Sequence, residues 1–410
     1  MKLYYILLSA ILLVACNTQT ATTPSINYLE DYVSDVTYLA HDSLEGREVG
    51  TQGEVIAATY IAKRMEEIGL APKGDDNNYF QIFTRKTKAH PHDTLMQGDV
   101  VEGRNVLGFI DNNSENTIVI GAHYDHLGYG EEGSLADSAG QIHNGADDNA
   151  SGVAAMLGLA NKLKSVNLKS NVLFTAFTGE EKGLWGSNYF VKNSTLSNSE
   201  MNFMINMDMV GRLDSNNRLA IYGIGTSPVF KPILDSCNTF GFKSKFDSSG
   251  VGPSDHTSFY LADVPVLHFF TGQHKDYHKP TDDTEFINFE GIVKVADYIE
   301  NIVLSLNQYD TIPFTKTKEK SNKARAFKVT LGVIPDYLYD GMGMRIDGVK
   351  QDRPAENAGI EKGDIVVKMG QFDLKNMTDY MNCLSKFEKG KTTVVQVKRG
   401  EEILDKNVTF

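Results

Sequence analysis

Between about residues 25 and 310, short apolar runs alternate with segments that have the spacing of amphipathic helices. Four runs have the length of buried strands, at 117–121, 171–177, 202–207 and 264–270. Apolar residues recur at helical spacing over 152–163, 183–191 and 289–306. Alternation of this kind is typical of a mostly parallel sheet with helices on both faces. The pattern therefore predicts an α/β domain whose ligands bind beyond the carboxyl ends of the strands.

The alternation stops after residue 310. Residues 311–324 contain four lysines and no apolar periodicity, as expected of a solvated linker. Residues 325–410 contain several short strand-like runs and one expected helix at 378–387. We therefore predict a larger domain over 17–310, a lysine-rich linker, and a small, mainly β domain over 325–410.

The first 16 residues have the pattern of an export signal. Twelve mostly apolar residues follow Lys2, which is too few for a stable transmembrane helix but suits the core of a signal peptide. The run ends in Leu13-Val-Ala-Cys16, which resembles the bacterial lipobox, in which the cysteine is lipidated. We expect a signal peptide over 1–16 and a protein exported to the bacterial cell envelope with a lipid anchor on Cys16. The alternative is a plain secretory signal with an incidental cysteine.

Charge and cysteine content exclude two classes of partner and site. The 53 acidic and 40 basic residues give a formal charge of -13, which disfavours nucleic-acid binding. Three cysteines are too few for a disulfide framework or a thiolate zinc site. Because Cys237 and Cys383 lie in different predicted domains, we expect them to be free, buried thiols.

Clusters of histidine and acidic residues lie where the predicted strands end. They span 122–126, 145–152, 178–181, 206–209 and 276–283. Each alone has an ordinary explanation, since acid pairs are usually solvated turns and Asp-Asp-Asn is a good helix N-cap. Together they place two histidines and three carboxylates at one edge of the sheet. Histidine and carboxylates bind zinc and similar divalent metals, and two cations would resolve the repulsion between converging carboxylates.

This set of clusters, in this order, resembles the M28 family of zinc metallopeptidases, which includes aminopeptidases with two co-catalytic zinc ions. The resemblance covers about residues 35–305, including the upstream segment 39–53. The ligands that it implies are His123 and Asp208 for one zinc, Glu181 and His278 for the other, and Asp148 as the bridge. The acidic tract offers Asp147 or Asp148, and the family spacing to Ser151 selects Asp148. The resemblance also implies a cis peptide bond after the bridging aspartate.

The same resemblance implies the catalytic roles. Three protein ligands for each zinc leave an open position, which is typical of a catalytic site. Glu180 matches the general base that takes a proton from water and passes it to the leaving amine. Asp125 matches the acid that orients the imidazole of His123. His126 and His143 flank the ligand clusters, either at the rim of the site or on the solvated surface.

The C-terminal segment Ala358-Gly-Ile-Glu-Lys-Gly-Asp364 resembles the core motif of PDZ domains attached to bacterial proteases, and the resemblance spans 326–410. Such domains bind an extended peptide as an added strand at a sheet edge. Leu331, Gly332 and Val333 match the loop that receives the carboxylate of a peptide or protein C-terminus. The alternative is a closed unit that only caps the larger domain.

These observations predict a lipid-anchored exopeptidase that acts on peptides and uses two zinc ions. We expect it to cleave from the N-terminus, as an aminopeptidase, in preference to the C-terminus. The same scaffold also suits a carboxypeptidase or a glutaminyl cyclase, which uses one zinc, although the tract 147–152 favours the peptidase. A non-catalytic lipoprotein that binds peptides through its PDZ unit is the alternative from another class. Cobalt or manganese can occupy similar sites.

Overall fold

The computed structural model describes residues 28–86, 98–317 except 137, 139 and 195, and 329–410 except 337, 338, 340, 350–352 and 376. The predicted signal peptide, Cys16 and much of the predicted linker lie outside these residues. Among the described residues, no helix combines the length and apolar content that crossing a bilayer requires.

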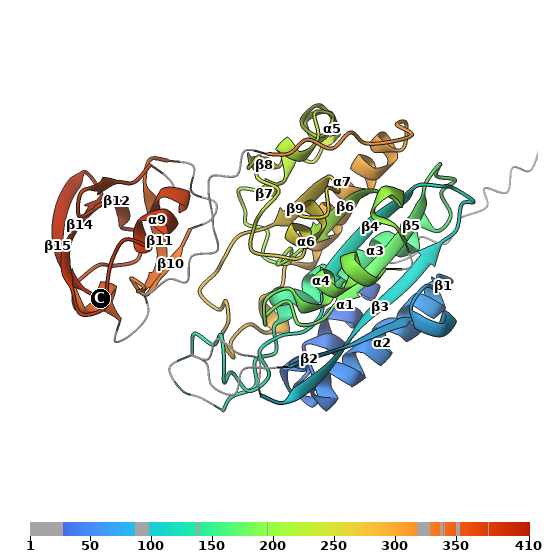
Figure 1. Cartoon of the computed structure of the whole chain (residues 1–410), viewed down its shortest axis with the longest axis horizontal. Helices are drawn as coiled ribbons and strands as arrows, with labels where there is room; N and C mark the ends of the chain where they lie inside the picture. Colours follow the sequence, from blue (N-terminus) through green and yellow to red (C-terminus); the bar gives the residue numbers. More distant parts are fainter. Residues whose placement is uncertain are drawn as a thin grey trace, which may run out of the picture.

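The larger sheet has nine strands in the described residues, and its centre is parallel (Figure 1). The strands are β1 Ala71–Pro72, β2 Phe80–Lys86, β3 Val100–Ile110, β4 Thr117–His123, β5 Asn171–Phe177, β6 Met201–Met207, β7 Arg218–Tyr222, β8 Lys243–Phe246 and β9 Val266–Phe270. The central order is β5-β4-β6-β9, with every neighbouring pair parallel. Antiparallel pairs join β3 to β5 and β7 to β9, so the sheet is mixed toward its edges. The four strands predicted from the sequence are the four parallel central ones.

Helices cover both faces of this sheet. They are α1 Tyr28–Leu39, α2 Gln52–Ile68, α3 Gly152–Leu163, α4 Trp185–Asn193, α5 Phe230–Cys237, α6 His256–Tyr260 and α7 Phe289–Leu306. Shorter turns are η1 Asp42–Arg47, η2 Asp75–Asn77, η3 Ala146–Ser151, η4 Asn198–Glu200, η5 Ile224–Thr226 and η6 Thr284–Phe286.

Successive residues of the central strands point to opposite faces, as the pleat requires. In β4, Ile118 and Ile120 pack in the core that contains α1, α2, α3, α5 and α7. Val119 packs in the core on the other face, with Phe190 of α4 and Phe259 of α6. All seven residues of β4 are buried because both faces are covered. The continuous apolar runs in the sequence follow from this burial.

The C-terminal residues form a second, antiparallel sheet, drawn in orange and red in Figure 1. Its strands are β10 Val333–Pro335, β11 Met344–Val349, β12 Ile365–Met369, β13 Phe372–Asp373, β14 Thr392–Arg399 and β15 Glu402–Thr409, with helices α8 Pro354–Asn357 and α9 Met377–Leu384. The strand order β10-β11-β12-β14-β15 leaves β10 at an edge. The unit has its own core, to which Val366 and Val395 contribute. The fold prediction, an α/β domain followed by a small β-rich domain, is thus confirmed. Cys237 and Cys383 are both buried and free, as predicted.

Candidate metal centre

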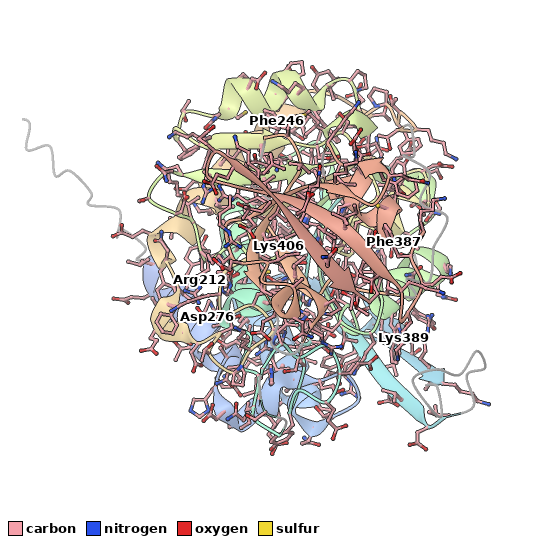
Figure 2. All side chains as sticks on the ribbon, turned by 90° about the vertical axis from the view of Figure 1, so that its left-hand side faces the viewer. Arg212, Phe246, Asp276, Phe387, Lys389 and Lys406 are labelled. Carbon is pink, nitrogen blue, oxygen red and sulfur yellow. The ribbon has the colours of Figure 1, made fainter. Side chains whose placement is uncertain are left out.

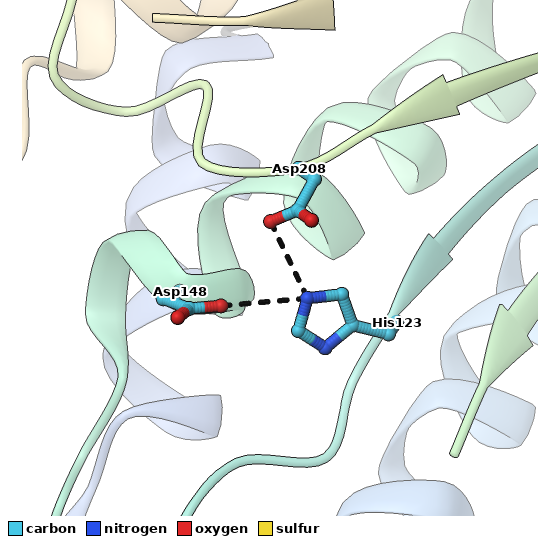
Figure 3. Close-up of side chains that lie close together, drawn as sticks. All are labelled: His123, Asp148 and Asp208. Carbon is cyan, nitrogen blue, oxygen red and sulfur yellow. Dashed lines mark ion pairs between the residues drawn. The ribbon is translucent and has the colours of Figure 1, made fainter. Parts of the chain in front are cut away.

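His123, the last residue of β4, faces two carboxylates in a buried site (Figure 3). Its Nε2 atom lies 3.4 Å from Oδ1 of Asp148 and 3.3 Å from Oδ1 of Asp208. In a tetrahedral zinc site with bonds of about 2.0 Å, neighbouring ligand atoms are separated by about 3.3 Å. The three side chains therefore fit a single divalent cation.

A second group of donors shares Asp148. The Nε2 atom of His278 lies 3.2 Å from Oδ2 of Asp148 and 3.2 Å from Oε2 of Glu181. Each oxygen of Asp148 thus faces a different histidine, which is the arrangement that a bridging carboxylate needs. The structure brings together all five ligands that the family resemblance implied.

The Nδ1 atoms of both histidines face backbone carbonyl oxygens. Nδ1 of His123 lies 3.2 Å from the carbonyl of Asp125, and Nδ1 of His278 lies 2.9 Å from that of Gly133. Because a carbonyl only accepts hydrogen bonds, each Nδ1 carries the proton, and a neutral ring then has its lone pair on Nε2. Both rings thus present a free Nε2 toward the carboxylates, as a metal ligand must.

Asp148 lies on η3, the buried turn between β4 and α3. Oδ2 of Asp282 accepts hydrogen bonds from the amides of Asp147 and Asp148, at 3.0 Å each. The side chain of Asn149 donates to the carbonyl of Met207 at 3.0 Å, which ties the turn to the end of β6. The Asp148–Asn149 peptide bond is cis, as the resemblance implied.

Asp147 faces away from the candidate ligands. Its carboxylate accepts hydrogen bonds from Ser151 Oγ at 3.0 Å and lies 3.1 Å from Nε2 of His274. Beyond His274, Arg212 donates to Asp276 at 2.9 Å, and the two side chains lie together in Figure 2. This geometry favours Asp148 over Asp147 as the ligand, the choice made from the family spacing.

Glu180 and Glu181 follow β5, and Asp125 holds the backbone of both. The carboxylate of Asp125 accepts hydrogen bonds from the amides of Glu180 at 3.1 Å and Glu181 at 3.4 Å. Its Oδ1 lies 3.6 Å from Nδ1 of His123, too far for a good hydrogen bond. Asp125 therefore contacts the loop that carries the glutamates more closely than it contacts the imidazole, where its own backbone carbonyl is nearer.

Neighbouring acids in the site have opposite pKa shifts. Burial raises the pKa of Glu180 well above its ordinary value, although the residue keeps some contact with solvent. The charge of His123 lowers this pKa, whereas the charges of Glu181 and Asp208 raise it further. Burial would also raise the pKa of Glu181, but the charge and hydrogen bonds of His278 and the hydrogen bond of His126 hold it at about 2. Divergent shifts in adjacent carboxyls are typical of acid and base pairs in active sites.

The candidate ligands line an open hollow of about 490 Å³. Its other lining residues are mainly aromatic or apolar: Met209, Tyr222, Pro253, Phe270 and Tyr277, together with Glu180, His268 and Gln273. His268 lies on the apolar strand β9 and is buried, yet it reaches this hollow. Asp255, in the segment 254–257, is fully buried, and burial raises its pKa to about 7.

The structure shows two candidate functional residues that the sequence did not predict to be buried near the site. His126 is completely buried, with Nδ1 3.0 Å from Oε1 of Glu181, so it lies inside the site and not on the surface. Arg47 is also buried, and it donates hydrogen bonds only to backbone carbonyls, including those of Tyr124 and Asn144. The spacing of His126 from His123 gave a signal for the first. Arg47 lies in the upstream segment 39–53 that belongs to the family resemblance, but its burial was not predicted because a lone arginine in a polar loop is usually exposed.

The predicted carboxylate-binding loop of the PDZ unit precedes and opens β10. Leu331 is buried in the core, and its carbonyl accepts a hydrogen bond from Ala355 at 2.8 Å. Gly332 has a φ of 77°, and a Cβ atom there would lie 2.2 Å from Cβ of Arg353. Its amide donates to Oγ1 of Thr330 at 3.1 Å, so an incoming carboxylate would have to displace that bond. Val333 begins β10, whose second edge has no strand partner among the described residues.

Two family models match the chain, one in each of its two parts. Residues 105–303 match the family model of peptidase family M28, and residues 315–410 match that of the PDZ domain. Residues 105–303 are therefore similar to M28 peptidases, and residues 315–410 are similar to PDZ domains.

Individual relatives cover part of the chain. Aminopeptidase YwaD of Bacillus subtilis is 31% identical over 222 residues, which are 51% of this chain and 45% of that protein. This chain thus spans about half the length of the curated relatives that it matches.

Solved structures share the fold at lower identity. A Zn-dependent exopeptidase from Parabacteroides distasonis has a TM-score of 0.54 and 17% identity, over 67% of this chain and 97% of that one. The glutaminyl cyclase of Porphyromonas gingivalis has a TM-score of 0.56 and 17% identity, over 68% of this chain and 98% of that one.

Proposed function

We propose that this protein is an aminopeptidase that depends on two zinc ions and removes N-terminal residues from peptides. One observation carries the proposal: Asp148 directs one oxygen to each of two donor groups, with separations of 3.2–3.4 Å between the histidine nitrogens and the carboxylate oxygens. These separations suit two cations that share one carboxylate. His123 and Asp208 would hold the first, and His278 and Glu181 the second.

Zinc ions held there would supply Lewis acidity, which lowers the pKa of water and polarises a peptide carbonyl. Glu180 lines the same hollow as the ligands but belongs to neither donor group. In this proposal Glu180 accepts a proton from the attacking water and delivers that proton to the leaving amine. Asp125 fixes the glutamate loop through the amides of Glu180 and Glu181.

The hollow also supports an exopeptidase. Aromatic and apolar residues beside the ligands, including Tyr222, Phe270 and Tyr277, offer contact area for one apolar side chain of the substrate. The name of the relative Aminopeptidase YwaD supports amino-terminal polarity over the carboxypeptidase alternative.

A glutaminyl cyclase is the second candidate, because the Porphyromonas gingivalis enzyme of that name shares the fold. The completeness of both donor groups favours the peptidase, since a cyclase of this type requires one zinc. We further propose that the protein is exported and anchored through Cys16, and that the free edge of β10 receives an extended peptide.

The test uses the purified protein and a panel of peptides. One set has free N-termini, a matched set has acetylated N-termini, and a third begins with glutamine to detect cyclisation. We expect cleavage of the free set alone, loss of activity with a chelator, and recovery with zinc. Cleavage of blocked peptides from their C-termini would assign the other polarity, and ring closure without cleavage would assign a cyclase. Full activity in metal-free protein would contradict the proposal.

A further inference from the structure

His126 lies three residues after the candidate ligand His123, on the same loop after β4. Its side chain is completely buried, with Nδ1 3.0 Å from Oε1 of Glu181. Its ring also packs edge-on against the ring of His278, with centroids 5.8 Å apart and an interplanar angle of 71°. It therefore contacts two of the candidate ligands of the second metal.

His126 also lies within reach of a metal held by Asp148 and Glu181, since one donor atom from each of these three residues lies within 4.8 Å of the others, but His278 is the closer of the two histidines to Asp148. Nδ1 of His126 lies 3.9 Å from the nearer oxygen of Asp148, whereas Nε2 of His278 lies 3.2 Å from Asp148 and 3.2 Å from Glu181. The two oxygens of Glu181 are divided between the histidines, since Oε2 faces His278 and Oε1 faces His126. Oε2 is thus the oxygen placed for the metal, and His126 contacts the other one.

The contact is a hydrogen bond with a fixed direction. An ionised carboxylate only accepts hydrogen bonds, so Nδ1 of His126 donates to Oε1 of Glu181. Nε2 of His126 is buried and has no hydrogen-bond partner among the described residues. The ring therefore makes one specific polar contact, and that contact is with a candidate ligand.

We propose that His126 is a positioning residue for the second metal site, which holds Glu181 so that its Oε2 atom faces His278 and Asp148. The inference rests on the proposed two-metal function. One loop then supports Glu181 twice, because Asp125 binds its amide and His126 binds its carboxylate. Removal of a hydrogen-bond partner of a metal ligand typically weakens metal binding about 10–100-fold.

Four variants of the full-length protein test this role. In His126→Asn the amide nitrogen replaces Nδ1, so the bond to Glu181 is conserved. In His126→Gln the amide lies one bond further along, at the position of Nε2, and the bond is lost. His126→Ala removes the side chain. His143→Asn is the matched control, because His143 is a buried neighbour whose ring nitrogens contact Ser134 and the carbonyl of Gln141 and no candidate ligand.

The measurement is zinc affinity, by competition with a chromophoric chelator, together with thermal unfolding of the metal-free proteins. We expect one of the two zinc sites, the one that contains Glu181 and His278, to lose about 10–100-fold in affinity in the Ala and Gln variants, and less than about threefold in the Asn variant and the control. The affinity of the other site should change little in all four variants. If the Ala variant fails to fold, the comparison of the Asn and Gln variants still tests whether the hydrogen bond to Glu181 is required.

Wild-type affinities in the Ala and Gln variants would overturn the positioning role and leave the two-metal site intact. Equal losses in Asn and Gln would also overturn it, because the ring itself would then be required, as a ligand or for packing. Fewer than two zinc ions in the wild-type protein would instead contradict the proposed function, and this inference with it.

Discussion

Replacement of Arg47 with methionine should destabilise the larger domain strongly. The guanidinium is 1% exposed and donates hydrogen bonds to the carbonyls of Leu39, Tyr124, Asn144 and Gly145. Asn144 and Gly145 lie just before the turn that carries Asp148, and Tyr124 lies on the loop after β4. Each buried carbonyl left without a donor costs about 1–3 kcal/mol. The variant no longer buries a charge, and that gain offsets part of the loss.

We therefore expect a net loss of about 3–5 kcal/mol in the free energy of unfolding, because the cost of four unpaired carbonyls exceeds the gain from no longer burying the charge. At roughly 2 °C per kcal/mol for a domain of this size, the midpoint of thermal unfolding should fall by about 6–10 °C.

Fluorescence during urea denaturation of the metal-free protein is the assay. The chain has one tryptophan, and Trp185 is buried in the larger domain, so the signal reports on that domain. Arg218→Met is the control, because Arg218 is 40% exposed and its ion pair with Asp214 should contribute no more than about 1 kcal/mol. A loss below about 1 kcal/mol in Arg47→Met, or one no larger than in the control, would show that the buried guanidinium does not stabilise the domain.

Two further predictions concern the other parts of the chain. Arg399 lowers the pKa of Asp364 against the opposing effect of burial, so the PDZ unit should be stabilised above the ordinary carboxyl pKa of about 4 and lose this stability as the pH falls below it. Hydrogen exchange of β14 amides should show this pH dependence in the wild-type protein and less of it in Asp364→Asn; an equal dependence in both would contradict it. Cys16→Ser should move the protein from the membrane to the soluble fraction of cells, because a twelve-residue apolar core does not hold a chain in a bilayer; a variant that stays in the membrane fraction would contradict the lipid anchor.

The central strands could be predicted from the sequence because both faces of the sheet are buried. Val119 and Ile120 point to opposite cores, so the run that contains them is apolar throughout. The edge strands carry no such signal. β8, Lys243–Phe246, is exposed or half-buried along its length, and its composition is that of a loop.

The clusters that contain the candidate ligands could be predicted because they lie at strand ends, and the family resemblance then selected the individual residues within them. The contacts that support them depend on pairings distant in sequence. Arg47 and Asn144 are 97 positions apart, and Asp282 binds the amide of Asp148 from 134 positions away. The same holds for Asp125. Its position two residues after His123 can be read from the sequence, but its contact with the glutamate loop depends on the pairing of β4 with β5.

Glu180 and Glu181 are neighbours with the same side chain, yet we assign them different roles. Zinc content and peptide hydrolysis rate in Glu180→Gln, with Glu181→Gln as the matched variant, distinguish these roles. Glutamine keeps the size of the side chain but does not accept the proton. We predict that Glu180→Gln retains both zinc ions and loses about 10²–10⁴-fold in rate, while Glu181→Gln loses zinc from the site that it shares with His278. A near-normal rate in Glu180→Gln, or loss of zinc there with retention in Glu181→Gln, would contradict the account.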